Sequence, residues 1–123
     1  MTTGPQPIVP LSQANLTSIP LSYAYLDTIN LNQAFLKYSN FHFSDLHNAD
    51  FGGARLDYSD LSLANLRSVT FTGTNLTGAN LNGADLTGAN LTGAILAGAV
   101  LTRANLSGSK LTGATMLDGS KHP

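Results

Sequence analysis

The chain of 123 residues contains no cysteine, no glutamate and no long apolar run. The absence of cysteine excludes a disulfide framework and a thiolate metal site. The starting segment, MTTGPQPIVP, has no basic stretch followed by an apolar run, so we expect no secretory signal. No segment approaches the roughly 18 consecutive apolar residues that indicate a transmembrane helix. We therefore expect a cytoplasmic protein without a membrane partner.

Charge is also scarce and nearly balanced. Six lysines and arginines stand against seven aspartates, which gives a formal net charge of -1. So weak a net charge creates no field that attracts nucleic acid or an anionic membrane, and it gives no support to mimicry of a polyanion. We therefore expect no nucleic-acid partner. The length fits one domain rather than two.

What the sequence does contain is a repeat with a period of five residues. The 22 positions at intervals of five from residue 11 to residue 116 hold 18 leucines, three phenylalanines (Phe41, Phe51 and Phe71) and Met116. The 22 positions that lie two residues before these hold 13 alanines, and the other nine hold Ser, Ile, Val or Thr. This period fits neither an amphipathic helix, near 3.6, nor a half-buried strand, at 2. A search for internal repeats must therefore precede the assignment of elements.

The two repeating rows are predicted to point inwards. Within each pentad they are separated by one outward residue, which is the spacing of a β-strand, and the remaining two residues must turn a corner. Repetition winds the chain into coils whose backbone groups bond to the coils above and below, about 4.8 Å away. The sequence thus predicts a solenoid with its leucines and phenylalanines buried along one axis. A helix is disfavoured, because one glycine per pentad would cost about 1 kcal/mol each.

The second corner position differs between the two halves of the chain. It is glycine at positions 73, 78, 83, 88, 93, 98, 108 and 113, with Arg103 as the exception. Glycine is expected there if this residue takes the positive φ of a type II turn. Earlier corners, from Gln13 to Ser68, mostly carry larger residues, for which a positive φ is costly. We therefore predict a different, less regular turn in the first half.

The repeats resemble those of the pentapeptide repeat family, whose consensus is A(D/N)LXX. Direct matches include Ala14-Asn15-Leu16, Ala49-Asp50-Phe51 and Ala84-Asp85-Leu86. The resemblance implies an all-β fold, a right-handed quadrilateral β-helix with four pentads per coil and about 5.5 coils over residues 9–117. Residues 1–8 would then form an N-terminal cap segment, and residues 118–123 a C-terminal tail. The square cross-section and its hand come from the resemblance and not from the periodicity.

Outward charges give a check on four pentads per coil, because residues 20 apart should then stack. Asp27, His47 and Arg67 form one such column, and Lys37 and Asp57 form another. The check is a weak one, since each exposed pair contributes under about 1 kcal/mol.

The ends of a solenoid expose apolar side chains and unpaired backbone unless something covers them. Pro5, Pro7 and Pro10 bracket Ile8 and Val9, so an extended N-terminal segment is expected to cover the first coil. The tail MLDGSKHP is too short, and too interrupted by Gly and Pro, for a capping helix. We therefore expect a monomer or an end-to-end homodimer through the C-terminal coil.

Large apolar residues outside the inward rows are concentrated in the first half. At a spacing of 20, Tyr23, Phe43 and Leu63 form one column, and Tyr38 and Tyr58 another. Two interpretations remain open: these side chains dock a protein partner, or they pack on one another and on the N-terminal segment. The candidate docking surface comprises Tyr23, Tyr25, Phe35, Tyr38, Phe43, Tyr58 and Leu63.

Catalytic chemistry has little support, because a packed rod offers little concavity. His42 and His47 with Asp45 and Asp50 are the only imidazole-carboxylate cluster, and their spacing places the two histidines on adjacent faces. A metal site needs three or four converging ligands. We therefore expect no catalytic residue, no cofactor and no metal.

The expected function is a non-enzymatic scaffold that docks a protein partner of unknown identity. An alternative follows from the resemblance, since some members of the family mimic DNA and interact with type II topoisomerases. Those members carry strongly acidic surfaces and a C-terminal dimerisation helix, both of which this sequence lacks. The resemblance is to a family that is especially abundant in cyanobacteria, where many members have no known role.

Overall fold

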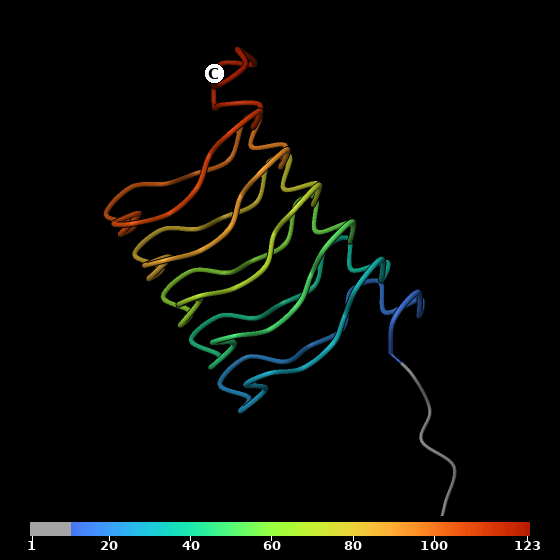
Figure 1. The fold of residues 1–123 in the computed structure, drawn as a ribbon. Helices are drawn as coiled ribbons and strands as arrows, with labels where there is room; N and C mark the ends of the chain where they lie inside the picture. The colour runs from blue at the N-terminus through green and yellow to red at the C-terminus, as the bar shows by residue number, and fades with distance from the viewer. Residues whose placement is uncertain (1–10) are drawn as a thin grey trace, which may run out of the picture.

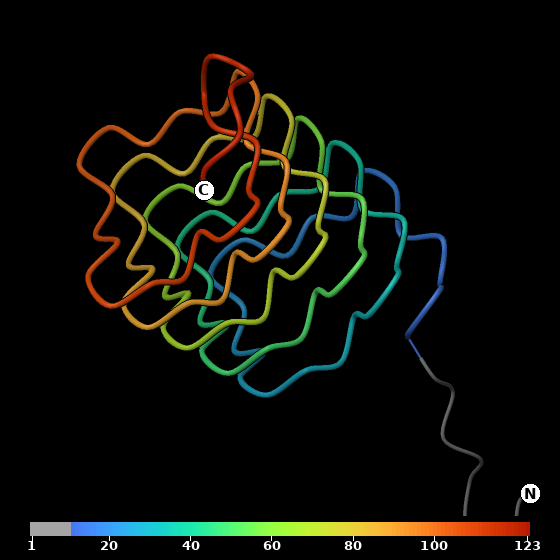
Figure 2. The same cartoon turned by 45° about the horizontal axis from the view of Figure 1, so that its top comes forward.

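A computed structural model describes residues 11–123, which form a rod of stacked coils (Figure 1 and Figure 2). Between residues 11 and 123 there is no helix, so none that could span a membrane, and no strand is longer than one bridged residue. One outward residue per pentad forms a parallel bridge with the residue 20 positions later, from Asn15↔Phe35 to Ile95↔Thr115. A spacing of 20 means four pentads per coil, as the stacked charges predict.

The bridged residues define the four faces of a quadrilateral β-helix. Face A carries the outward residues 15, 35, 55, 75, 95 and 115, and face B carries 20, 40, 60, 80 and 100. Face C carries 25, 45, 65, 85 and 105, and face D carries 30, 50, 70, 90 and 110. The two turn residues between faces form a corner: corner AB holds 17–18, corner BC 22–23, corner CD 27–28 and corner DA 32–33, with equivalents 20 residues apart.

The leucine and phenylalanine row fills the axis of the rod, as predicted. From Leu31 to Leu96, every residue of this row is at most 1% exposed. Phe51 contacts the rings of Phe41 and Phe71, with centroids 5.8 Å and 5.4 Å apart. Burial of each such side chain contributes about 1.5–3 kcal/mol, so this row is the main source of stability.

Backbone hydrogen bonds join neighbouring coils on both sides of each bridge. The N–H of Leu36 donates to the carbonyl of Arg55 at 2.8 Å, and the N–H of Phe35 donates to the carbonyl of Ala14 at 2.9 Å. The second corner residue bonds as well, since the N–H of Gln33 donates to the carbonyl of Gly52 at 2.8 Å. The ladder therefore fixes the corners as firmly as the faces.

The prediction of a less regular turn in the first half is wrong. Both halves use the same four-residue turn, closed by a hydrogen bond such as that from the N–H of Ala14 to the carbonyl of Leu11 at 3.0 Å. Its third residue has a positive φ whether or not it is glycine: 64° at Gln13, 57° at Leu63 and 65° at Gly78. This conformation costs a non-glycine residue about 1–2 kcal/mol. The ladder outweighs that cost, because a different turn would break the pairing of the corner with the next coil.

The small row contains serines in two different environments. Ser44 Oγ donates to the carbonyl of Phe41 at 2.7 Å. Ser39 and Ser59 are equally buried, but their hydroxyls have no hydrogen-bond partner within residues 11–123. A buried polar group without a partner costs about 1–3 kcal/mol.

Replacing Ser59 with alanine is therefore expected to raise the free energy of unfolding by about 1 kcal/mol. Alanine removes the unpaired hydroxyl, and Ala79 and Ala99 occupy the equivalent positions of the next coils. The matched control is Ser44→Ala, which removes a bonded hydroxyl and is expected to leave stability unchanged or lower. Urea denaturation measures both variants, and an equal loss of stability in the two would contradict the assignment.

The C-terminal tail folds back on the last coil without forming a helix. Lys121 forms an antiparallel bridge with Thr115, and the N–H of His122 donates to the carbonyl of Ala114 at 2.7 Å. The chain reverses through a turn in which the N–H of Gly119 donates to the carbonyl of Met116 at 2.9 Å. This hairpin, at the red end of the rod in Figure 2, covers the C-terminal end of face A. The predicted N-terminal cap, residues 1–8, lies outside the described residues.

Candidate functional site

The outward aromatic residues of the first half form two ridges on neighbouring corners. On corner BC the rings of Tyr23 and Phe43 stack with centroids 5.5 Å apart, and Leu63 follows them in the column. On corner AB the rings of Tyr38 and Tyr58 stack with centroids 5.8 Å apart. These are the two columns that a spacing of 20 predicts.

Stacking leaves about half of each ridge side chain exposed to solvent. The exposed fractions are 65% for Tyr23, 56% for Tyr38, 53% for Phe43, 54% for Tyr58 and 47% for Leu63. The two ridges flank face B, whose outward residues beside them are the polar Asn40 and Asp60. Face B is therefore a polar strip between two apolar ridges.

The other two residues of the predicted docking surface lie outside the ridges. Tyr25 is on face C and Phe35 is on face A, and both are exposed. The seven residues thus extend over three adjacent faces and the two corners between them, and they do not form one flat patch. The four rings of the ridges pack on one another, as one interpretation of the sequence holds, and they also remain accessible, as the other requires.

Both ridges end where the corner residue becomes glycine. A Cβ atom at Gly78 would lie 2.6 Å from the ring of Tyr58, and one at Gly83 would lie 2.6 Å from Leu63 Cδ2. The last side chain of each ridge therefore lies over the glycine of the next coil. These two glycines provide room for a neighbouring side chain in addition to a positive φ.

A buried carboxylate next to the corner AB ridge has two cationic partners. Asp57 is only 5% exposed. Its Oδ2 lies 3.8 Å from Nζ of Lys37, the predicted partner, and 3.8 Å from Nη2 of Arg55, a second partner that the spacing of 20 does not predict. Lys37 Nζ also lies 5.2 Å from the ring centroid of Tyr38 and 5.8 Å from that of Tyr58. Two cations around one carboxylate give this cluster a net positive charge.

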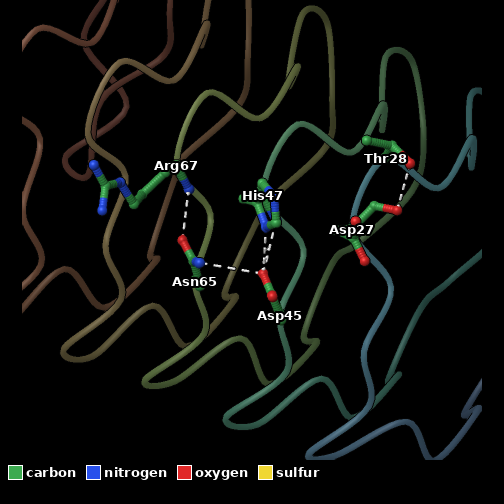
Figure 3. Close-up of polar contacts among 6 residues, drawn as sticks. All are labelled: Asp27, Thr28, Asp45, His47, Asn65 and Arg67. Carbon is green, nitrogen blue, oxygen red and sulfur yellow. Dashed lines mark hydrogen bonds and ion pairs between the residues drawn. The ribbon is translucent and has the colours of Figure 1, made fainter.

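The charged column of corner CD places His47 between Asp27 and Arg67, as predicted (Figure 3). His47 Nδ1 lies 2.7 Å from Asp45 Oδ1, and Asn65 Nδ2 donates to the same oxygen at 3.1 Å. The Arg67 side chain extends away from His47. The hydrogen bond with Asp45 raises the pKa of His47, and the bond with His47 lowers the pKa of Asp45.

Replacing Asp45 with asparagine is expected to lower the pKa of His47 towards its ordinary value, because the bond that favours the imidazolium is lost. With its pKa raised by folding, His47 contributes stability below the ordinary histidine pKa, and this contribution is lost as pH rises through the raised pKa. Asp45, with its pKa lowered, contributes above the ordinary aspartate pKa and loses this as pH falls through the lowered pKa. The pair therefore stabilises the fold most between the two ordinary values.

An NMR titration of the His47 ring protons measures this change, with the ring of His122 in the tail as an internal reference. The same His47 pKa in the wild-type protein and in Asp45→Asn would contradict the assignment.

His42 does not join this cluster. Its Nδ1 lies 2.8 Å from Ser62 Oγ on corner BC, and Ser62 in turn donates to Asp60. A buried serine that donates to a carboxylate is not activated as a nucleophile by the histidine. Asp50 lies on face D and accepts a hydrogen bond from the N–H of Gly52. In the described part of the chain, no three such side chains gather to hold a metal ion.

Comparison with known proteins gives a family and several similar structures. The family model of pentapeptide repeats matches residues 14–53, 44–83 and 79–116. HetL, a pentapeptide repeat protein involved in heterocyst differentiation regulation from the cyanobacterium Nostoc sp. strain PCC 7120, is 38% identical with a TM-score of 0.68. The match covers 91% of this chain and 55% of HetL, so this chain spans little more than half of that protein.

Two further solved structures are similar. A pentapeptide repeat protein of the Arabidopsis thaliana thylakoid lumen is 28% identical, with a TM-score of 0.65 over 91% of this chain and 71% of that one. Another, from Nostoc PCC 7120, is 46% identical, with a TM-score of 0.56 over 69% of this chain and 66% of that one. No curated protein matches the chain by sequence. With its ladder of bridges at intervals of 20 and repeats matched along most of its length, the chain belongs to the pentapeptide repeat family, whose fold is the right-handed quadrilateral β-helix.

Proposed function

We propose that this rod is a non-enzymatic scaffold that docks a protein partner on the docking surface formed by Tyr23, Tyr25, Phe35, Tyr38, Phe43, Tyr58 and Leu63. The observation that carries the proposal is the exposure of about half of each ridge side chain despite the stacking. Aromatic side chains are enriched at the centres of protein interfaces and contribute most to their affinity. No comparable group of exposed aromatic residues occurs in the second half of the chain.

The backbone beneath the ridges supports the same proposal. The N–H of Tyr23 donates to the carbonyl of His42 at 2.9 Å, and the N–H of Phe43 donates to the carbonyl of Ser62 at 3.0 Å. Each ridge residue is therefore held by the ladder, and its ring is also held by the ring next to it. A surface that is already ordered loses little conformational entropy when a partner binds.

Single substitutions test the docking surface. Phe43→Ser and Tyr38→Ser are each expected to keep the far-UV circular dichroism spectrum, since each removes a stacking contribution of about 0.5–1.5 kcal/mol. Both are expected to abolish capture of a partner from extracts of the source cells. The matched controls are Val100→Ser and Leu117→Ser, which replace exposed apolar residues outside the surface and are expected to retain capture. Equal capture by all four variants would refute the proposal.

We further propose that the scaffold acts in the cytoplasm, as a monomer or as an end-to-end homodimer through its C-terminal coil. The backbone of the tail hairpin bonds to residues 113–116 of that coil, on corner DA and face A. Within residues 11–123, the N–H groups of Leu101, Leu106 and Leu111 have no backbone partner. Sedimentation velocity over a range of protein concentrations distinguishes the two oligomeric states, and cell fractionation tests the location.

The topoisomerase alternative has less support. A mimic of DNA needs a continuous acidic surface. In residues 11–123 two of the aspartates have basic groups beside them: Asp27 shares its column with His47 and Arg67, and Lys37 and Arg55 surround Asp57.

A further inference from the structure

A hollow of about 560 Å³ lies where corner DA meets face A, next to Phe35. It is lined by Gln13, Gln33, Phe35, Gly53 and Arg55. Gln13 and Gln33 stack along corner DA, and the amide of Gln13 donates to the amide oxygen of Gln33 at 3.0 Å. The next residue of that column is Gly53, so the column of side chains stops there and a glycine forms the floor of the hollow.

The walls of the hollow differ in chemistry. Phe35 provides an exposed aromatic ring, and the exposed Arg55 provides a guanidinium. Arg55 Nη2 lies 3.8 Å from Oδ2 of the buried Asp57, which is too long for a hydrogen bond, and Asp57 Oδ1 accepts none within residues 11–123. The amide oxygen of Gln33 already accepts from Gln13, which leaves the N–H groups of the Gln33 amide as free donors. The hollow therefore offers one apolar wall and two groups of hydrogen-bond donors.

Among the residues that line the hollow, the one charged side chain is that of Arg55. The nearby Asp57 is buried, and it lies close to both Arg55 and Lys37. The other nearby carboxylate, Asp50, lies on face D around the corner and accepts the N–H of Gly52. No carboxylate is among the residues that line the hollow.

We propose that this hollow binds a carboxylate carried on an apolar group. Phe35 contacts the apolar part, while Arg55 and the Gln33 amide donate to the carboxylate oxygens. A guanidinium recognises a carboxylate through paired hydrogen bonds, and a small number of polar groups beside an aromatic wall is typical of ligand sites of this size. The carboxylate belongs either to a free organic acid or to an acidic residue next to an apolar one in a peptide, and this site does not require the protein-docking function proposed above.

Titration of the full ¹⁵N-labelled chain tests the site with two probes. The probes are 3-phenylpropionate, a free acid, and the blocked peptide acetyl-Gly-Phe-Asp-Gly-amide. We expect shifts of the Gly53 backbone amide, the Gln33 side-chain amide and Arg55 Nε–H, with a Kd on the order of 1 mM for so small a ligand. The controls are 3-phenylpropionamide and the same peptide with asparagine in place of aspartate, both expected to bind at least about 10-fold more weakly.

The pattern of binding separates the two sources. Saturable shifts with 3-phenylpropionate alone indicate a free acid, and shifts with the peptide alone indicate an acidic peptide. Shifts with both probes indicate that the hollow accepts either source. Each of these results supports the proposal. Absence of saturable shifts with both acids, or equal binding of the neutral analogues, overturns it.

A substitution at the floor tests the location of the site. Gly53→Gln adds a side chain to the hollow, on a corner where Gln13 and Gln33 already hold glutamine with φ of 64° and 58°. The added Cβ would lie 3.2 Å from Gln33 Cγ, so the flexible Gln33 side chain must shift by a few tenths of an ångström. The control is Gly73→Gln on the same corner, where an added Cβ meets nothing within 4 Å. We expect at least a 10-fold loss of affinity in Gly53→Gln, and none in Gly73→Gln, with both variants unfolding cooperatively on heating. Equal binding by the two variants overturns the assignment.

Discussion

Replacing Phe51 with alanine is expected to lower the free energy of unfolding by about 3–5 kcal/mol. The ring is fully buried on the axis and contacts Phe41 on one side and Phe71 on the other. Its removal leaves a cavity that the rigid ladder of coils cannot collapse to fill. Urea denaturation measures the loss as a lower midpoint at an unchanged m-value.

Two controls separate the size of the side chain from its location. Phe51→Leu places the residue found at most other axis positions, and it is expected to cost less than about 1.5 kcal/mol. Phe43→Ala removes the same ring from corner BC, where half of it is exposed, and it is expected to cost about 0.5–1.5 kcal/mol. If Phe43→Ala were as destabilising as Phe51→Ala, the division between axis and surface would be wrong.

Replacing Gly78 with alanine is expected to cost about 1.5–3.5 kcal/mol. The residue has a φ of 65°, which is unfavourable for alanine by about 1–2 kcal/mol. The new Cβ would also lie 2.6 Å from the ring of Tyr58, which must leave its rotamer at a cost of about 0.5–1.5 kcal/mol. Thermal and urea unfolding measure the sum.

The matched control is Gly98→Ala, one coil further along the same corner. Gly98 has a φ of 68°, but an added Cβ there meets only the backbone of Gly78 at 3.9 Å. It is therefore expected to cost about 1–2 kcal/mol from backbone conformation alone. In a Tyr58→Ala background the difference between the two variants is expected to disappear, as a double-mutant cycle would measure. An equal cost of both variants in the wild-type background would mean that the ring moves aside freely.

The features that depend only on the period could be predicted from the sequence. The axis row from Leu31 to Leu96 follows from a step of five. The ion pair of Lys37 with Asp57 and the column of His47 follow from a step of 20. In each case the spacing alone predicts the contact, because the repeat fixes whether a side chain points to the axis or outwards.

The turns of the first half could not be predicted in this way. Local preference argues against a positive φ at Gln33 or Leu63, and no nearby residue signals it. The cause is the ladder, since the N–H of Leu63 donates to the carbonyl of Asn82 at 2.9 Å. A contact with the next coil thus determines the conformation of a single residue.

Features that depend on the absence of a side chain, as at a glycine, could not be predicted from the period either. The hollow beside Phe35 exists because Gly53 has no side chain to continue the column of Gln33.

The second partner of Asp57 could not be predicted from the spacing of 20, because Arg55 lies only two residues away in the sequence. The direction of its long side chain decides whether the guanidinium meets the carboxylate. The pattern of a single sequence shows the period of the repeat, but it does not show in which direction a long side chain points.

Bridges at a constant interval of 20 residues have a consequence for how the chain folds. The entropy of closing a loop depends on its length, and every new coil closes a loop of the same modest size on the coil before it. Nucleation at any one coil can then spread towards both termini. Lengthening such a rod by duplication adds stability without a longer conformational search, because the mean separation of contacting residues stays the same however many coils are added.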